Sequence, residues 1–169
     1  VDDRTKEAFH KGRFTGIPAY MKHIRNVTKI YMDDNGESAA NFKYTVIHSP
    51  NFKFPMTVGE ELGFSKEQLD PMVKVSKNIG NTYSGITELC WALEHSKPED
   101  RIMVVKYGSG AQAVITSVRV TDAILDVVKS RPTVDQLLES RQEIDFHTYN
   151  KIMRKKENIH GVTNTLFKE

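Results

Sequence analysis

Apolar residues along the chain alternate between helical spacing and short continuous runs, which predicts alternating helices and strands. After Pro18, which suits the first turn of a helix, they recur every three or four positions until Asn35-Gly36 ends the pattern. Residues 42–47 form an apolar run that predicts a buried strand, and the proline that follows stops it because proline donates no ladder hydrogen bond. A second helix is expected over residues 55–62, with Gly63 as its cap.

The second half of the chain predicts elements of both kinds. Residues 73–76 favour a short strand, and residues 86–93 place apolar side chains on one helical face. The β-branched run at 102–105 is typical of a central strand that is covered on both faces. Residues 113–120 follow it after a connection too short for a crossover, so these two strands are expected to be antiparallel. Residues 122–130 are expected to be helical.

The predicted order is therefore helix, strand, helix, strand, helix, strand, strand. It indicates an α/β fold with a mixed sheet of four strands and helices on both faces. Ser65 with Gln68, and Thr133 with Gln136, have the spacing of capping boxes and predict two short additional helical segments. The chain opens with a helix where such a layer usually opens with a strand, so a strand is expected upstream.

Composition narrows the possible functions. The length of 169 residues suits one domain, and the net charge of +2 argues against a dedicated nucleic-acid binder. Cys90 is the single cysteine, so no internal disulfide or thiolate metal site is possible, and a reducing cytoplasm is expected. No apolar run has the roughly 20 residues of a membrane helix, and no signal peptide is recognisable. Because the chain begins with Val1, we expect a longer or cleaved natural polypeptide, with an artificial chain start as the alternative.

Four short motifs lie at strand ends or in the loops that follow, where open α/β sheets place their ligands. His48 leaves a predicted strand and could act as a general acid or base, or its ring could simply be satisfied by nearby backbone. Asn81, in a glycine-bounded turn, could donate to a substrate carbonyl or only cap the next helix. The turn 107–111 could admit a ligand or be a plain hairpin, and Arg13 could bind a phosphate or lie in a solvated loop. Cys90 is interpreted as an inert core residue, and the histidines show no metal-ligand spacing.

Three stretches, residues 12–20, 79–85 and 104–111, together resemble the C-terminal half of the 3-hydroxy-3-methylglutaryl-CoA (HMG-CoA) synthase family, archaeal type, within the thiolase superfamily. The resemblance runs from about Lys11 to Lys156, and residues 132–149 are similar to the family's C-terminal extension. It implies a half-domain over residues 1–130, an extension over 131–169, and one half of a thiolase-like αβαβα fold. The first strand of that half is missing, so a second chain is expected to complete the fold.

The resemblance also implies the chemistry. The family condenses acetyl-CoA with acetoacetyl-CoA: a cysteine is acetylated, a glutamate removes a methyl proton, and the resulting carbon attacks the acetoacetyl ketone. His48 matches the catalytic histidine that protonates the ketone oxygen, and Asn81 matches the asparagine that binds the acyl group beside it. CoA thioesters are expected as substrates, with no tightly bound cofactor and no metal. The positions that match substrate or CoA contacts are Arg13, Thr15, Lys53, Tyr83, Ser84 and Ser109.

Departures from the family pattern shape the expected partners. No segment matches the family's nucleophilic cysteine or general-base glutamate, and Cys90 lies elsewhere, so a partner chain with the N-terminal half is expected to supply both. Thr57 stands where archaeal members commonly have arginine, and Glu88 lies in a helix that is more apolar in relatives, where a buried carboxylate needs a partner. By resemblance, thiolase and a small zinc-containing scaffold protein are possible further partners; nucleic acid and membrane are not expected.

Two alternatives stay open at this stage. The chain could belong to another acyltransferase or ketoacyl synthase of the same superfamily, because pocket shape decides that question. It could also be a catalytically silent interaction module within a thiolase complex. Retention of both His48 and Asn81 favours the enzyme.

Overall fold

A computed structural model describes residues 19–48, 51–80, 84–108 and 112–153. The chain divides into two compact units, Val1–Leu138 and Glu139–Glu169, and each is described by itself. The predicted boundary between residues 130 and 131 stays a prediction.

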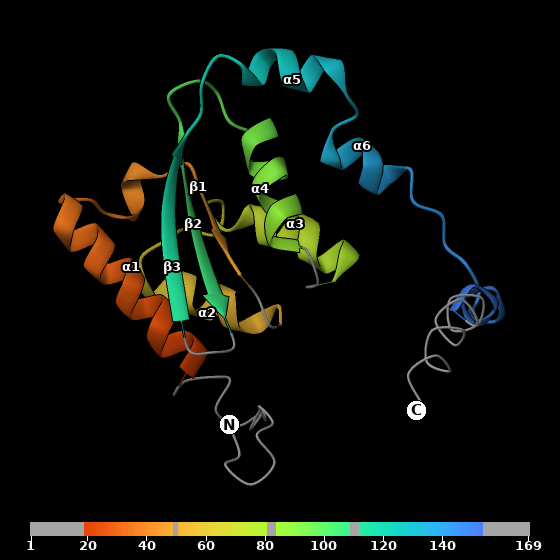
Figure 1. The fold of residues 1–169 in the computed structure, drawn as a ribbon, viewed down its shortest axis with the longest axis horizontal. Helices are drawn as coiled ribbons and strands as arrows, with labels where there is room; N and C mark the ends of the chain where they lie inside the picture. The colour runs from red at the N-terminus through yellow and green to blue at the C-terminus, as the bar shows by residue number, and fades with distance from the viewer. Residues whose placement is uncertain (1–18, 49–50, 81–83, 109–111, 154–169) are drawn as a thin grey trace, which may run out of the picture. The chain divides into compact units, whose positions relative to one another are not determined.

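The sheet of the first unit has three strands in the order β1-β2-β3 (Figure 1). Strand β1 (Tyr44–Ile47) pairs in parallel with β2 (Arg101–Gly108), and β2 pairs antiparallel with β3 (Gln112–Arg119). The predicted closing hairpin is confirmed, and so is a mixed sheet. The four central residues of β2, Ile102 to Val105, are fully or almost fully buried, as expected for a strand covered on both faces.

Within the described part of the chain, six α-helices and a 3₁₀ turn carry labels, in addition to the helical residues 146–153. They are α1 (Lys22–Asn35), η3 (Ala39–Asn41), α2 (Lys53–Glu61), α3 (Asp70–Ile79), α4 (Ser84–Glu94), α5 (Ile124–Ser130) and α6 (Val134–Glu139). Helix α1 ends at Gly36, whose φ of 61° is the left-handed conformation that glycine adopts without steric cost. Both predicted capping boxes form: Ser65 and Gln68 exchange hydrogen bonds of 2.9 and 3.3 Å, and so do Thr133 and Gln136.

The strand predicted at residues 73–76 is wrong, because these residues lie inside α3. The buried residues of this segment recur with helical spacing, at positions 71, 72, 75 and 76, so one helical stripe can bury all of them. The outer edge of β1 is bonded to a turn instead, where the Thr45 amide donates to the Gln68 carbonyl at 2.9 Å. The described sheet therefore has three strands rather than the four expected.

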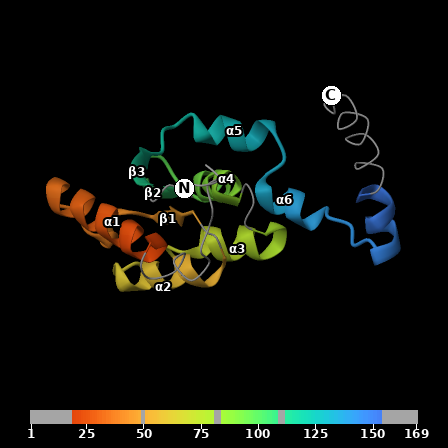
Figure 2. The ribbon, with the colours of Figure 1, turned by 60° about the horizontal axis from the view of Figure 1, so that its bottom comes forward.

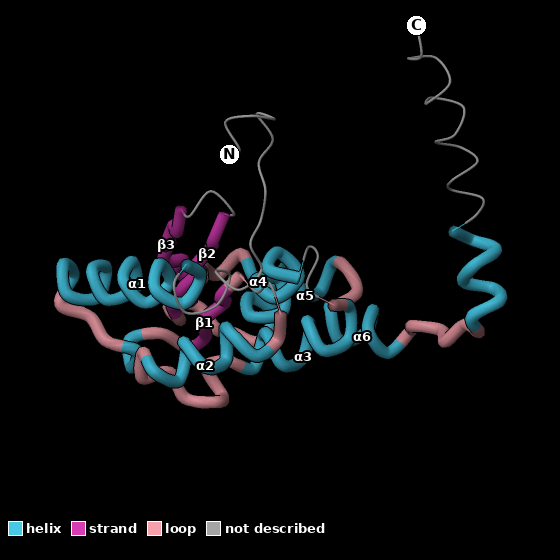
Figure 3. The backbone as a smooth tube through the Cα atoms, turned by 90° about the horizontal axis from the view of Figure 1, so that it is seen from below, coloured by secondary structure: helices cyan, strands magenta, loops and turns pink. Residues whose placement is uncertain are grey.

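Helices cover both faces of the sheet, as predicted (Figures 2 and 3). Helices α1 and α2 lie on one face, where Ile47 and Val105 join the main apolar cluster together with Tyr20, Ile24 and Leu69. Helix α4 lies on the other face, where Ala92 packs on Val46, Ile102 and Val104. Helix α3 contacts both β1 and α4, so it closes the β1 side of the layer.

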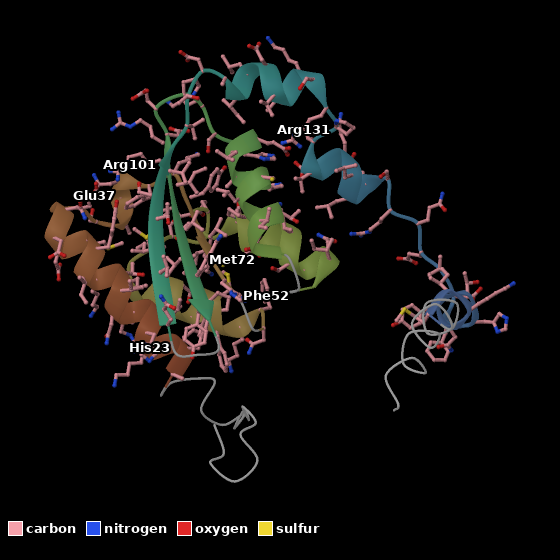
Figure 4. The ribbon with its side chains drawn as sticks, viewed as in Figure 1. His23, Glu37, Phe52, Met72, Arg101 and Arg131 are labelled. Atoms are coloured by element: carbon pink, nitrogen blue, oxygen red, sulfur yellow. The ribbon has the colours of Figure 1, made fainter. Side chains whose placement is uncertain are left out.

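A charged network ties the loop after α1 to the central strand. The guanidinium of Arg101, the first residue of β2, donates to Glu37 at 3.1 Å and to the Ser117 hydroxyl at 2.9 Å. Figure 4 shows Glu37 and Arg101 close together at the end of the sheet where β2 begins. Because Arg101 presents a planar fork of donors, it can hold both partners at once.

Helix α6 is anchored on α4. The Trp91 indole nitrogen donates to Asp135 Oδ1 at 2.8 Å, and His95 Nε2 lies 2.9 Å from Asp135 Oδ2. Val134 joins Val75 and Trp91 in a third apolar cluster. In the second unit, residues 146–153 are helical, and the rings of Phe146 and Tyr149 stack 6.4 Å apart.

Candidate active site at the carboxyl ends of the strands

The carboxyl ends of β1 and β2 lie at the same edge of the sheet, because the two strands are parallel. The N-terminal end of α4 faces the same side, since α4 returns through residues 95–100 to the start of β2 (Figure 1). Ligands of open α/β sheets bind at such an edge. The edge is therefore the candidate active site.

His48 follows β1 directly at this edge. Its backbone amide donates to the Val105 carbonyl at 2.8 Å, and its carbonyl accepts a hydrogen bond of 2.6 Å from the Tyr20 hydroxyl. Although the residue as a whole is exposed, partial desolvation and then the positive charge of Lys106 lower the pKa of the His48 imidazole below its ordinary value. Both effects disfavour the imidazolium, so the ring is mainly neutral near pH 7.

An aromatic cluster lies beneath His48. Tyr20 is completely buried, and its ring centroid is 6.0 Å from that of Phe54 and 5.4 Å from that of Tyr107, the latter edge-on. His23 lies 6.2 Å from the Tyr107 ring, and Figure 4 shows it at the same side of the molecule as Phe52. Burial, and then the negative charge of Glu88, raise the pKa of Tyr20 well above its ordinary value, so its hydroxyl stays protonated.

The start of α2 also lies next to His48 in sequence. Asn51 Oδ1 accepts hydrogen bonds of 3.0 Å from the amides of Lys53 and Phe54, which satisfies two donors at the helix N-terminus. Lys53, the first residue of α2, is exposed, so its ammonium is free to meet a solvent-borne anion. Thr57, where an arginine is common in archaeal members, donates its hydroxyl to the Lys53 carbonyl at 3.1 Å.

Of the site residues predicted from sequence, the structure places His48 and Lys53 at this edge. Ser84 is the first residue of α4. The others, Arg13, Thr15, Asn81, Tyr83 and Ser109, lie outside the described residues, and their roles stay predictions.

Sequence reasoning did not single out Tyr20 or Lys106 as residues of the site. Tyr20 has the same apolar spacing as an ordinary core residue. No sequence signal therefore distinguishes a tyrosine that contacts the site from one that only fills the core. Glu88 is fully buried, and the Ser76 hydroxyl of α3 donates to it, which supplies the partner that a buried carboxylate was expected to need.

The described residues hold no group of three or more histidine, cysteine or acidic side chains able to bind a metal ion. None of the helices described is long and apolar enough to cross a membrane. Cys90 is a free thiol, half-buried on α4, and packs against the cluster around Trp91.

Solved structures define the class of fold. The chain superposes on an HMG-CoA synthase crystallised with CoA (TM-score 0.59, 16% identity, 85% of this chain and 40% of that one). It also superposes on 3-oxoacyl-(acyl carrier protein) synthase III of Pseudomonas aeruginosa (TM-score 0.51, 19% identity, 68% of this chain and 35% of that one). The fold is thus one half of a thiolase-like fold, as predicted.

Sequence comparison gives the family. Residues 55–168 match the family model described as "Hydroxymethylglutaryl-coenzyme A synthase C terminal". Hydroxymethylglutaryl-CoA synthases of Methanopyrus kandleri and Thermococcus gammatolerans are 43% and 44% identical over 148 residues, which is 86% of this chain. The chain belongs to the hydroxymethylglutaryl-CoA synthase family. It spans only 42% of the length of these two relatives.

Proposed function

We propose that this chain is the histidine-bearing half of an HMG-CoA synthase, which condenses acetyl-CoA with acetoacetyl-CoA. The observation that carries the proposal is the position of His48. It lies at the carboxyl edge of the sheet, with both backbone polar groups hydrogen-bonded and its imidazole mainly neutral. The identity of 43–44% with synthases over 86% of the chain supports the same conclusion.

In the proposed reaction, His48 acts on the acetoacetyl ketone. As the new carbon–carbon bond forms, negative charge develops on the ketone oxygen. The protonated form of His48 stabilises this charge, donates its ring proton to the oxygen and is left as the neutral imidazole, which a lowered pKa favours. Asn81 is proposed as a second donor to the acyl group, because it precedes in sequence the start of α4, and that end of α4 faces this edge. Two donors aimed at one oxygen stabilise the transition state more than the planar ketone.

The remaining predicted residues are proposed to bind the CoA part of the substrates. Lys53 supports this proposal, because an exposed ammonium at the start of a helix suits an anionic phosphate. Arg13 and Thr15 are proposed as further CoA contacts, and Tyr83, Ser84 and Ser109 as contacts to the acyl or pantetheine part. CoA thioesters enter as substrates, so the proposed reaction needs no tightly bound cofactor.

A partner chain is proposed to supply the N-terminal half, with its cysteine nucleophile and its glutamate base. Cys90 is a poor candidate for the nucleophile, since it is half-buried against an apolar cluster rather than presented in an electropositive opening. The coverage of 42% of the relatives' length also favours a further part. Thiolase and a zinc-containing scaffold protein are proposed as possible additional partners, in the cytoplasm.

The test is to isolate the chain from its own source with whatever it binds and to assay condensation of acetyl-CoA with acetoacetyl-CoA. We expect a co-purifying chain with a reactive cysteine, and a loss of kcat of about 100-fold or more in His48→Ala, the usual scale for removing an acid–base residue. His147→Ala, an exposed site in the second unit, is the matched control and is expected to keep full activity. A stable, isolated and inactive chain, or an active His48→Ala variant, would contradict the proposal.

A further inference from the structure

We infer that Tyr20 is a positioning residue for His48, which it holds through the hydrogen bond from its hydroxyl to the His48 main-chain carbonyl. The contact is 2.6 Å long and joins residues 28 positions apart in the sequence. The inference rests on the proposed function, because positioning matters for catalysis only if His48 acts in the reaction.

The two backbone hydrogen bonds of His48 do different things. The hydrogen bond from the His48 amide to the Val105 carbonyl, at 2.8 Å, extends the parallel ladder of β1 and β2 by one residue. It fixes the amide end of His48 against β2. The carbonyl bond from Tyr20 fixes the side where the chain leaves the sheet. With both ends of the residue held, the direction of its Cα–Cβ bond is set, and the imidazole can move only by side-chain rotation. An exposed catalytic ring is thereby presented from a fixed backbone.

Tyr20 is itself held by three elements. It precedes α1, and its fully buried ring contacts Phe54 of α2 and Tyr107 of β2. A buried phenol needs a partner for its hydroxyl, and the His48 carbonyl is the partner found here. The raised pKa of Tyr20 means that the hydroxyl donates throughout the neutral range and does not lose its proton there.

The same tyrosine connects His48 electrostatically to α4. The negative charge of Glu88 favours the protonated phenol, and Glu88 is in turn held by the hydroxyl of Ser76 in α3.

The test replaces Tyr20 with phenylalanine, which keeps the ring and removes only the hydroxyl. In the native assembly we expect kcat to fall about 10-fold with KM changed less than 2-fold, because sub-ångström misplacement of a reacting group is costly in rate. NMR of the His48 ring gives a second readout: once the anchor is lost the ring is better hydrated, so its titration midpoint rises toward the ordinary value. Tyr31→Phe is the matched control, since Tyr31 lies on α1, which Tyr20 precedes, and its hydroxyl contacts Arg101 at 3.4 Å instead of His48.

The two readouts separate this inference from the proposed function. If His48→Ala keeps full activity, the proposed function fails, but the NMR comparison still tests the positioning. If Tyr20→Phe leaves kcat and the His48 titration as in the Tyr31→Phe control, the positioning role is refuted even when His48→Ala is inactive. Should Tyr20→Phe fail to fold, the unmodified protein still decides: we expect a slowly exchanging Tyr20 hydroxyl proton with a nuclear Overhauser effect to His48, and its absence overturns the inference.

Discussion

Replacing Gly59 with alanine tests how closely α2 must pack against the strand that carries the candidate catalytic histidine. A Cβ atom at Gly59 would lie 2.6 Å from Leu69 Cδ2, 3.1 Å from Leu69 Cδ1 and 3.5 Å from Ile47 Cδ1. Leu69 and Ile47 are both fully buried, and Ile47 directly precedes His48. The leucine must therefore move by roughly 1 Å within a closely packed interior.

Two opposing effects set the magnitude. Alanine is favoured over glycine inside a helix by about 1 kcal/mol, whereas overpacking a filled core costs about 1–3 kcal/mol. Gly59→Ala is thus expected to lower the free energy of unfolding by about 0–2 kcal/mol. Gly85 of α4 provides the matched control, because a Cβ there meets nothing within 4 Å. Gly85→Ala should raise the free energy of unfolding by about 0.5–1 kcal/mol, and the difference between the two variants isolates the packing cost.

Urea unfolding followed by circular dichroism measures both variants, and Leu69→Ala makes the test specific. Leu69→Ala alone should cost about 2–5 kcal/mol, because it leaves a cavity in the core. In that background the clashing methyl groups are absent, so Gly59→Ala should become neutral or stabilising. The reasoning is refuted if Gly59→Ala stabilises the unmodified chain as much as Gly85→Ala does, or if its cost persists after Leu69 is removed.

Two further predictions concern charge. Lys106→Gln should raise the NMR titration midpoint of His48, because a neighbouring positive charge no longer opposes protonation of the ring. Lys129→Gln is the control and should leave the midpoint unchanged. An unchanged midpoint in Lys106→Gln would show that Lys106 does not lower the pKa of His48. Because the folded-state pKa of His48 is lowered, its contribution to stability is present above its ordinary pKa and is lost as pH falls through the folded value. Asp135→Ala should cost about 1–2 kcal/mol and speed hydrogen exchange in α6, because it removes the acceptor of the Trp91 indole hydrogen bond and the partner of the partly exposed His95 ring. Asp126→Ala, at an exposed position of α5, should change stability by less than about 0.5 kcal/mol, and equal effects of the two variants would contradict the anchoring role.

Several elements of the fold could be predicted because their signals are local. The end of α1 at Gly36 follows from one left-handed glycine, and each capping box is made by two side chains three residues apart. The β2–β3 hairpin follows from the length of its connection. None of these features depends on what the rest of the chain does.

The candidate site was predictable only in part. His48 could be named as a candidate because a histidine that leaves an apolar run stands out in the sequence, and its role stays a prediction. The role of Tyr20 could not, since its contact with His48 spans 28 positions and its apolar spacing is that of any core residue. Lys106 could not be predicted as a neighbour of His48 for a similar reason. An exposed lysine near the end of a strand gives no local sign of a site, and only the parallel pairing of β1 and β2 brings it near His48.

The wrong prediction at residues 73–76 and the buried charge of Glu88 have one physical explanation. In a strand, Val75 and Ser76 would point to opposite sheet faces, and Ser76 would share its face with the polar Lys74. In the helix α3, both residues lie on the buried stripe, so Val75 packs beside Trp91 while the Ser76 hydroxyl reaches Glu88 of α4. The helix therefore supplies the hydrogen-bond donor that lets a carboxylate be buried where relatives were expected to be apolar. Propensity favoured a strand for the valines, but the tertiary need to satisfy Glu88 and to cover β1 outweighs it, as tertiary packing commonly does for short segments.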